Sequence, residues 1–315
     1  MMNISVIGAG YVGLITGIGF AKLNHQVSIV DLNDDLIKNL NENRPPFYEP
    51  ELVDYLNDSN IRNNLFFSTS YQKSINENTD IVFVCVQTPT DPDTGKTKTD
   101  YISSVMTELK KIESFNFIIC IKSTIKATLV EKISNEIDLD YKKIIFNPEF
   151  LREGSAFYDF FNPDRIVIGG SDQKGLNQCT ELYESFDCEK IITDSNSSQM
   201  IKYLSNTYLA MRLSFVNETY RLVSEFNGNP EEVLNAIGKD KRIGNDYFRP
   251  SPGWGGSCFP KDVKEVISSF QMDYQLPIIS EILRSNELHM AWFVDYILKI
   301  INEQSLENIV LIGAP

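Results

Sequence analysis

The chain has 315 residues, of which 42% are hydrophobic, and a formal net charge of −14 at pH 7. This length and composition predict a globular protein of two domains, and the acidic charge argues against nucleic acid or an anionic membrane as a partner. The five cysteines lack paired spacing and there are only two histidines, so neither a disulfide framework nor a metal site is expected. No apolar stretch approaches the roughly 18 residues of a membrane span and no charged leader precedes the first strand, which favours a cytosolic protein.

The first predicted elements surround a glycine-rich turn, Gly8-Ala9-Gly10-Tyr11-Val12-Gly13, between a β-branched run (residues 3–7) and a helical pattern. In a dinucleotide site the first glycine makes the turn, the second lets the backbone approach the pyrophosphate, and the third allows close helix packing. Asp31 follows the second predicted strand (residues 26–30), about 20 residues further on, where an acidic side chain binds ribose hydroxyls. Because Asp31 would repel a 2′-phosphate, the sequence favours NAD over NADP as cofactor.

Short apolar strands continue over residues 65–67, 81–86, 117–121, 144–146 and 165–168, with helical patterns between most of them. This alternation predicts an α/β fold with a doubly wound, Rossmann-like parallel sheet, in which ligands bind beyond the carboxyl ends of the strands. Polar segments follow three of these strands and are expected to converge there: Thr88-Pro89-Thr90, Ser123-Thr124 and residues 147–154. Each segment could alternatively be an ordinary turn or a helix cap.

Glu149 and Glu153, in the third of these segments, are four positions apart and would share one face of a helical turn. Such a pair can act as general bases if burial raises its pKa values, whereas a solvated pair has no special chemistry. Both alternatives remain open at the level of sequence.

The strand and helix alternation ends near Thr193, where we place the boundary between an NAD-binding domain (residues 1–193) and an all-helical domain (residues 194–304). Residues 197–226 predict one helix, with caps available at Ser195, Asn196 and Ser197 and a stop at residues 228–230. About 30 residues at 1.5 Å each would span about 45 Å, which suggests that the helix also forms a homodimer interface. Further helices are predicted over residues 230–237, 261–270 and 277–301.

The long helix places Lys202 and Asn206 on one face among apolar neighbours. A lysine in these surroundings either extends its ammonium to solvent or is positioned for function. Later in the chain, residues 238–259 contain four cationic side chains, which suits an anionic ligand in so acidic a protein.

Cys258 lies in a glycine-rich segment (residues 253–262), with Pro260 well placed for the first turn of a helix. The positive end of the helix dipole would favour the thiolate, which is the nucleophilic form. The alternative is a small buried hydrophobe in a tight turn, the commoner environment of a free cysteine. Finally, residues 308–315 resemble residues 3–8 and predict the first strand of a truncated third domain (residues 305–315).

Together these motifs resemble the nucleotide-sugar 6-dehydrogenases of the UDP-glucose/GDP-mannose dehydrogenase family, over nearly the whole chain. The matching segments are residues 8–13 with Asp31, residues 46–50, 88–90, 122–124 and 147–154, Lys202 with Asn206, and residues 240–244 and 255–262. The resemblance implies a four-electron oxidation of the sugar's primary alcohol to a carboxylate with two NAD molecules. It favours UDP-glucose as substrate and leaves GDP-mannose or another nucleotide sugar as alternatives.

The resemblance also implies a role for each matching side chain. Cys258 corresponds to the nucleophile, Lys202 and Asn206 to stabilisers of the oxyanion, and Asp262 and Thr124 to residues that hold a water molecule. Glu149 or Glu153 would assist hydrolysis, and Arg242 would reach the substrate of a neighbouring subunit. The implied cofactor set is Gly8, Gly10, Tyr11, Val12, Gly13, Asp31, Thr88, Thr124, Glu153 and Lys261, and the implied substrate set is Phe150, Leu151, Lys202, Asn206, Arg242, Tyr247, Ser251 and Gly255.

Two departures from the family pattern concern sugar fit: Gln87 stands where the family often has a small residue, and Trp254 is bulkier than the usual Phe or Tyr. The family's third domain, which helps bind the uridine diphosphate, is expected to be cut at its first strand. One rival function is therefore an inactive NAD-binding or dimerisation module. The other is a two-electron β-hydroxyacid-type dehydrogenase, a class that also joins a Rossmann domain to a helical domain with a Lys and an Asn four apart, and Cys258 argues against it.

Overall fold

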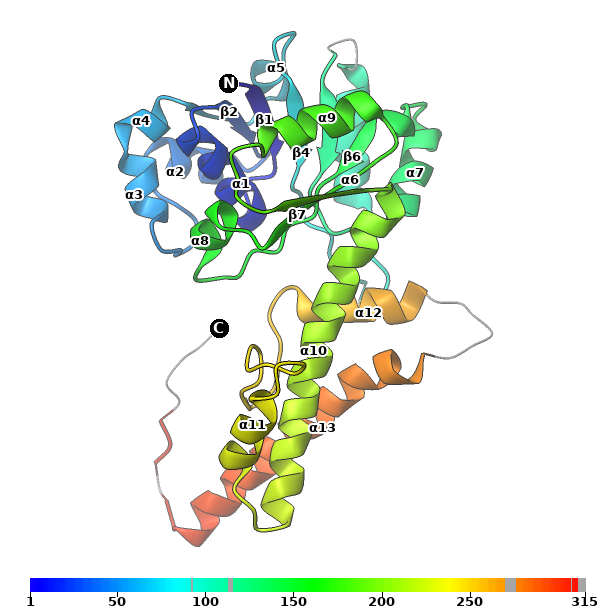
Figure 1. The fold of residues 1–315 in the computed structure, drawn as a ribbon. Coiled ribbons are helices and arrows are strands. Elements are labelled where there is room, and N and C mark those ends of the chain that lie inside the picture. The colour runs from blue at the N-terminus through cyan, green and yellow to red at the C-terminus, as the bar shows by residue number, and fades with distance from the viewer. Residues whose placement is uncertain (92, 113–115, 270–275, 307, 311–315) are drawn as a thin grey trace. The chain divides into compact units, whose positions relative to one another are not determined.

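The computed structural model describes residues 1–91, 93–112, 116–269, 276–306 and 308–310. The chain divides into two compact units (Figure 1). The first unit comprises residues 1–89 and 98–202, and the second comprises residues 90–97 and 203–315. Among the described helices, none is long and apolar enough to cross a membrane.

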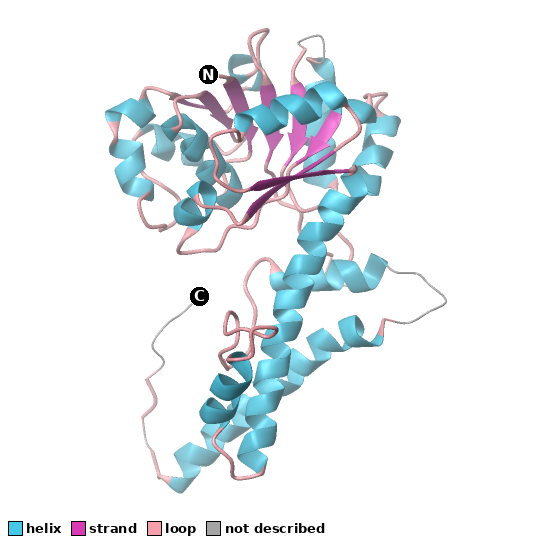
Figure 2. Cartoon of the chain, viewed as in Figure 1, coloured by secondary structure: helices cyan, strands magenta, loops and turns pink. Residues whose placement is uncertain are grey.

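An eight-stranded sheet forms the centre of the first unit (Figure 2). Its spatial order is β3-β2-β1-β4-β5-β6-β7-β8, and the first six strands in this order run parallel to one another. The chain therefore winds outward from β1 in both directions, which confirms the predicted doubly wound fold. The strands are β1 (Asn3–Ile7), β2 (Gln26–Val30), β3 (Leu65–Ser68), β4 (Ile81–Val84), β5 (Ile118–Ile121), β6 (Ile144–Phe146), β7 (Arg165–Gly169) and β8 (Glu189–Thr193).

The far edge of the sheet differs from the prediction of an all-parallel sheet. Strand β7 runs antiparallel to β6, with Phe146 opposite Gly169, and an additional strand, β8, pairs parallel to β7. Between β6 and β7 the chain forms only the short helix α8 (Ala156–Phe161). The ring of Phe160 in this helix packs edge-on against the ring of Phe20 in helix α1, with the two ring centroids 5.2 Å apart. This packing holds the connection between β6 and β7 against α1 (Tyr11–Lys22). A parallel pair of strands needs a long crossover, usually a helix, that returns the chain along the sheet, and this connection has none. Strand β8 escaped prediction because, as a half-exposed strand at the sheet edge, it lacks a continuous apolar run.

Helices cover both faces of this sheet (Figure 2). Successive residues of a strand point to opposite faces, so Ile4 and Val6 of β1 pack in one apolar cluster while Ile7 packs in another. The first cluster includes side chains of α1, α2 (Asp34–Asn41), α3 (Leu52–Asn57), α4 (Ser59–Arg62), α8 and α9 (Gln173–Leu182). The second includes side chains of α5 (Tyr71–Ser74), α6 (Asp100–Lys111) and α7 (Ala127–Glu136). A short 3-10 turn (Tyr141–Lys143) precedes β6.

The second unit contains most of helix α10 (Ser195–Glu225), which begins in the first unit, and helices α11 (Pro230–Gly238), α12 (Phe259–Ser269) and α13 (Pro277–Glu303). All four lie close to their predicted ranges. The cap of α10 differs, because the Asp194 carboxylate accepts a hydrogen bond from the Ser197 N–H (3.0 Å), so the serines expected as caps are part of the first turn. The predicted last strand falls mostly on residues 311–315, outside the described residues, and residues 308–310 form no strand.

Candidate active site

The glycine turn joins β1 to α1, and its three glycines serve different purposes. Gly8 has a φ of +101°, and a Cβ on Gly13 would lie 1.8 Å from the Gly8 carbonyl oxygen. A Cβ on Gly10 would meet no atom within 4 Å. The turn therefore requires Gly8 and Gly13 for its own geometry, whereas Gly10 leaves open space at the start of α1, as the approach of a pyrophosphate demands.

Asp31 lies at this turn, directly after β2. Its two carboxylate oxygens accept hydrogen bonds from the backbone N–H groups of Ala9 (2.8 Å) and Asn33 (3.0 Å). The acidic side chain is thus held beside the glycines, where it can reach the ribose of a bound dinucleotide.

Replacing Gly13 by alanine is expected to destabilise the first unit by about 1 to 3 kcal/mol, because the added methyl group would overlap the Gly8 carbonyl. Gly10→Ala is the matched control, since its Cβ has free space and should leave stability nearly unchanged while weakening NAD binding. Urea unfolding and calorimetric titration with NAD measure the two effects. Wild-type stability of the Gly13 variant would contradict the prediction.

Glu49 was not singled out by the sequence, which marked only residues 46–50 as a motif. Glu49 is 3% exposed, and its carboxylate accepts hydrogen bonds from Tyr11 Oη (2.9 Å) and from the N–H groups of Gly154 (2.9 Å) and Ala156 (2.8 Å). Burial, followed by the bond to Glu49, raises the pKa of Tyr11 well above its usual value of 10. Glu49 therefore fixes the end of the 147–154 segment to the first turn of α1.

The three polar segments that follow β4, β5 and β6 meet at the carboxyl edge of the sheet, as predicted. Thr88 Oγ1 donates a hydrogen bond to the Thr124 carbonyl (2.9 Å), which joins the first segment to the second. Lys122 Nζ donates to Asn147 Oδ1 (2.9 Å), and Tyr183 Oη donates to the same oxygen (2.6 Å). Tyr183, from the region after α9, was not foreseen as part of this buried network.

Glu149 and Lys202 form a buried ion pair within the first unit. Lys202 Nζ lies 2.9 Å from Glu149 Oε1, and the two side chains are 4% and 8% exposed. Residues 147–152 are not helical, so the expectation that Glu149 and Glu153 share a helical face is wrong: Glu149 is buried and Glu153 is exposed. The physical reason is local, because Glu149 Oε2 accepts the Leu151 N–H (2.7 Å) and Gly154 turns the chain with a φ of +86°.

Two opposing effects set the pKa of Glu149. Burial alone would raise it, but the charge and hydrogen bond of Lys202, the Leu151 N–H and the charge of Lys122 together hold it below its ordinary value of 4.5. Glu149 is thus an anion at neutral pH, and the raised pKa on which the general-base expectation depended is not found. Lys202 is buried in this pair, so the alternative that its ammonium extends to solvent is wrong.

Phe150 lies beside two cationic groups in the first unit. Its ring centroid is 3.9 Å from the Arg165 guanidinium carbon and 5.4 Å from Lys202 Nζ. The cations and the ring face attract each other, which orients the segment that the resemblance assigns to substrate.

Cys258 stands immediately before α12 in the second unit and is exposed, whereas Cys85, Cys120 and Cys179 are buried. Its carbonyl accepts the Asp262 N–H (2.9 Å), which makes it the first residue of the helical hydrogen-bond pattern. The core alternative for this cysteine is therefore excluded, and the thiol lies at the positive end of the helix.

Asp262, one turn into α12, is 1% exposed and has partners for both carboxylate oxygens. Asn206 Nδ2 donates to Oδ2 (2.6 Å), and Lys261 Nζ donates to Oδ1 (2.7 Å). Helices α10 and α12 are thereby linked beside the thiol, and the Asn206 amide is held in a defined orientation.

The loop before Cys258 is held by side chains that the sequence did not indicate. The Trp254 N–H donates to Asn286 Oδ1 (2.9 Å), and Asn286 Nδ2 donates to the Trp254 carbonyl (2.8 Å). The backbone of Ser251 also has two side-chain partners. Its N–H donates to Asn217 Oδ1 (2.9 Å), and its carbonyl is hydrogen-bonded to His289 Nε2 (2.8 Å). These polar residues of α10 and α13 looked like ordinary helix residues, because only long-range contacts reveal their partners.

The remaining predicted substrate residues lie near this loop in the sequence. Tyr247 is 37% exposed with a φ of +52°, and Gly255 is exposed. Arg242 is exposed and forms an ion pair with Asp240 (2.6 Å), which raises the pKa of the guanidinium.

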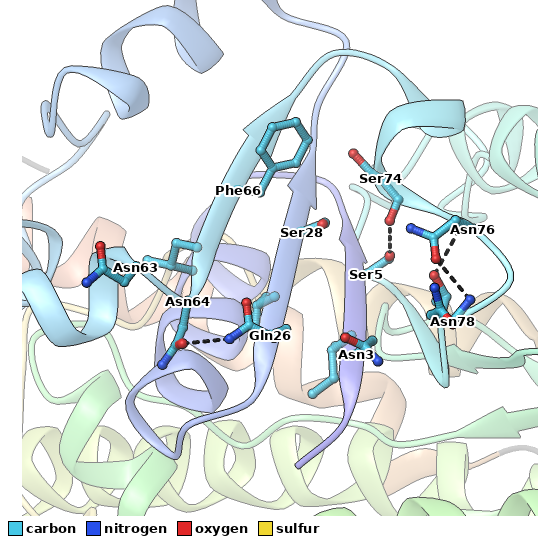
Figure 3. A pocket seen from close by; sticks show the side chains of 14 residues that line it. Asn3, Ser5, Gln26, Ser28, Asn63, Asn64, Phe66, Ser74, Asn76 and Asn78 are labelled. Carbon is cyan, nitrogen blue, oxygen red and sulfur yellow. Dashed lines mark hydrogen bonds between the residues drawn. The ribbon is translucent and has the colours of Figure 1, made fainter.

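A hollow of about 210 Å³ lies at the amino ends of β1, β2 and β3, away from the carboxyl edge of the sheet. It is lined by the first residues of these strands, Asn3, Gln26 and Leu65, and by neighbouring residues, whose side chains Figure 3 shows. Gln26 and Asn64 hydrogen-bond to each other at its rim (2.7 Å). None of the predicted site residues lines it.

Comparison with known proteins shows the family to which the chain is similar. Residues 2–187 match the family model for the NAD binding domain of the UDP-glucose/GDP-mannose dehydrogenase family, and residues 196–288 match the model for its central domain. UDP-glucose 6-dehydrogenase YwqF of Bacillus subtilis (strain 168) is 33% identical over an alignment that covers 99% of this chain and 72% of that protein.

Solved structures show the same similarity. A UDP-glucose dehydrogenase from Pyrobaculum islandicum superposes with a TM-score of 0.87 at 34% identity, covering 96% of this chain and 71% of that one. A GDP-mannose dehydrogenase from Pseudomonas aeruginosa gives a TM-score of 0.70 at 28% identity, covering 91% and 69%.

Proposed function

Because the chain belongs to the UDP-glucose/GDP-mannose dehydrogenase family, an NAD-dependent oxidoreductase family, we propose that it oxidises the C6 alcohol of UDP-glucose to the carboxylate of UDP-glucuronate. UDP-glucose is preferred over GDP-mannose because the relatives at 33% and 34% identity are UDP-glucose dehydrogenases, whereas the GDP-mannose dehydrogenase is 28% identical. The observation that carries the four-electron reaction is the exposed Cys258 at the start of α12.

The glycine turn and Asp31 fit the cofactor. Gly10 has open space where a side chain would stand, and the Asp31 carboxylate beside it disfavours a 2′-phosphate. NAD held there would supply the hydride acceptor for each of the two oxidations. The protein's own residues must bind the sugar, form the covalent bond and manage protons.

Covalent chemistry belongs to Cys258 in this proposal. The first oxidation leaves an aldehyde and releases a proton, and the Cys258 thiolate adds to the aldehyde carbon, forming a C–S bond and an oxyanion. Lys202 and Asn206 stabilise that negative oxygen. Loss of the second hydride leaves a thioester, and water then breaks the C–S bond, returning the thiol and releasing the carboxylate.

The hydrolytic step assigns roles to the carboxylates. Asp262 and Thr124 hold the attacking water, and Glu149, an anion at neutral pH, assists hydrolysis. We favour Glu149 over Glu153 for this role because Glu149 is the buried member of the pair and contacts Lys202. Glu153 then serves the cofactor side.

The stoichiometry of NADH tests the proposal. Incubation of the chain with NAD and limiting UDP-glucose is expected to yield two NADH per sugar consumed, with UDP-glucuronate as the product identified by mass spectrometry. One NADH per sugar would establish a two-electron dehydrogenase instead. Parallel assays with GDP-mannose and UDP-N-acetylmannosamine identify the preferred substrate. A higher kcat/KM with either sugar would show that UDP-glucose is not that substrate.

A homodimer through α10 is part of the proposal. Five exposed apolar side chains follow one another along the helix at spacings of four or seven residues: Leu204, Tyr208, Phe215, Leu222 and Phe226. This spacing forms a stripe suited to a partner helix. Sedimentation velocity tests it, and a monomer at micromolar concentration would argue against it.

A further inference from the structure

Residues 90–97 fold with the second unit although the chain on either side belongs to the first. The described residues of this stretch (90, 91 and 93–97) are here called the Thr90–Thr97 hairpin, because Thr90 and Thr97 pair as an antiparallel bridge. The Asp91 N–H donates to the Lys96 carbonyl (2.8 Å), and the Gly95 N–H donates to the Asp91 carbonyl (2.9 Å). Such a polar, turn-rich stretch could have been a plain surface loop, but it has a specific partner.

That partner is Glu265 on helix α12. Glu265 Oε2 accepts hydrogen bonds from both the N–H (2.6 Å) and the Oγ1 (2.8 Å) of Thr97, and Ser268 Oγ donates to the Gly95 carbonyl (3.2 Å). Glu265 is 1% exposed. Hydrogen bonds to a buried carboxylate are stronger than neutral ones, so the hairpin is firmly attached to this side chain.

Glu265 lies on the same face of α12 as the groups assigned to chemistry. Cys258, Asp262 and Glu265 occupy positions i, i+4 and i+7, which share one side of a helix. Asn206 holds Asp262 one turn before Glu265, so the face has two separate attachments, one from α10 and one from the hairpin. Two attachments along a helix resist rotation about its axis, which a single hydrogen bond does not.

We infer that Glu265 is a positioning residue: by holding Thr97 it fixes the rotation of α12, and so orients Asp262 and Cys258 for turnover. Glu265 acts through its helix and not by touching substrate. The inference rests on the proposed function, because it assigns the effect to the reaction that Cys258 and Asp262 perform.

Graded variants separate positioning from stability. Glu265→Ala is expected to lower kcat about 10- to 100-fold, since small misplacement of reacting groups is costly, while KM values for NAD and nucleotide sugar stay within about twofold. Glu265→Gln keeps an oxygen that can accept from Thr97 and is expected to restore most of kcat. Thr97→Val removes one donor and keeps the N–H, for an expected loss of about three- to tenfold.

Lys264→Ala is the matched control, because Lys264 is exposed on the neighbouring position of α12. It is expected to leave kcat unchanged. Limited trypsin digestion at Lys96 reports the attachment directly, and cleavage should be faster in Glu265→Ala and unchanged in the control. Should Glu265→Ala fail to fold, the milder Thr97→Val decides the question in its place.

The outcomes are distinguishable. Faster cleavage at Lys96 with wild-type kcat in Glu265→Ala and Thr97→Val would show that the hairpin is merely anchored, and would overturn the positioning role. A wild-type chain that forms no NADH from any nucleotide sugar would refute the proposed function, and this role with it. An active wild type, together with kcat values that decrease in the order Glu265→Gln, Thr97→Val, Glu265→Ala, supports the inference.

Discussion

Replacing Cys258 by serine is expected to lower kcat by at least about 1,000-fold, because the variant lacks the nucleophile on which the covalent steps depend. A serine hydroxyl is nearly isosteric with the thiol but is not ionised near neutral pH, so it cannot readily capture the aldehyde. The side chain is exposed and belongs to the second unit, whereas the glycine turn and Asp31 belong to the first. The dissociation constant for NAD is therefore expected to stay unchanged, as calorimetric titration can measure.

Cys188→Ser is the matched control for this substitution. Cys188 is half-buried in the first unit and has no role in the proposal, so turnover should be retained. Loss of NAD binding in the Cys258 variant would show that this cysteine supports the fold and not the reaction. Retained turnover in the same variant would remove the covalent mechanism altogether.

Replacing Lys202 by methionine is expected to reduce stability by about 3 to 5 kcal/mol, the usual effect of removing one partner from a buried ion pair. Methionine keeps much of the apolar stem but leaves the Glu149 carboxylate buried without the ammonium that now lies 2.9 Å away. We also expect kcat to fall about 100- to 1,000-fold, the range for loss of an oxyanion donor. Urea unfolding and NADH formation, measured on the same preparation, give the two values.

The pH dependence of this variant gives a signed test. In the wild type the pKa of Glu149 is held below its ordinary value of 4.5. The ion pair therefore contributes stability that is fully present when the pH is above the pKa of Glu149 in the unfolded chain. That stability is lost as the pH falls through the pKa in the folded protein. Without Lys202, burial becomes the dominant influence and raises that pKa. The stability difference between wild type and variant is therefore expected to be greatest near neutral pH and to shrink on acidification.

Glu149→Gln in the Lys202→Met background is the control for this result. The second substitution removes the buried charge, so the double variant should be more stable than Lys202→Met alone. It should not regain activity, because the ammonium is still absent. A double variant no more stable than the single one would show that the ion pair is not the source of the loss.

The glycine turn and the main helices were predictable because their signals are local. Gly8 and Gly13 are required by backbone geometry within a few residues, and the long helix α10 has no internal glycine or proline. The same holds for Cys258, since the proline and acidic residue just after it indicate a helix start. These features depend on neighbours in the chain, so periodicity and turn chemistry suffice to find them.

The positions of the Glu149 and Glu153 side chains could not be predicted from local sequence signals. Their spacing suggested a shared helical face, but the Leu151 N–H and the turn at Gly154 send one side chain inward and leave the other exposed. The antiparallel turn from β6 to β7 is of the same kind, since it follows from where α8 finds its apolar partners.

The sequence by itself determined a doubly wound NAD-binding unit, a long helix with Lys202 and Asn206 on one face, and a cysteine at a helix start. Only the tertiary structure decided which carboxylates are buried and what they hold: Glu49 reaches Gly154 across 105 residues, and Glu265 reaches Thr97 across 168. Local patterns arise from steric limits and hydrogen bonds within a few residues, whereas the burial and partner of a charge depend on segments that only folding brings together.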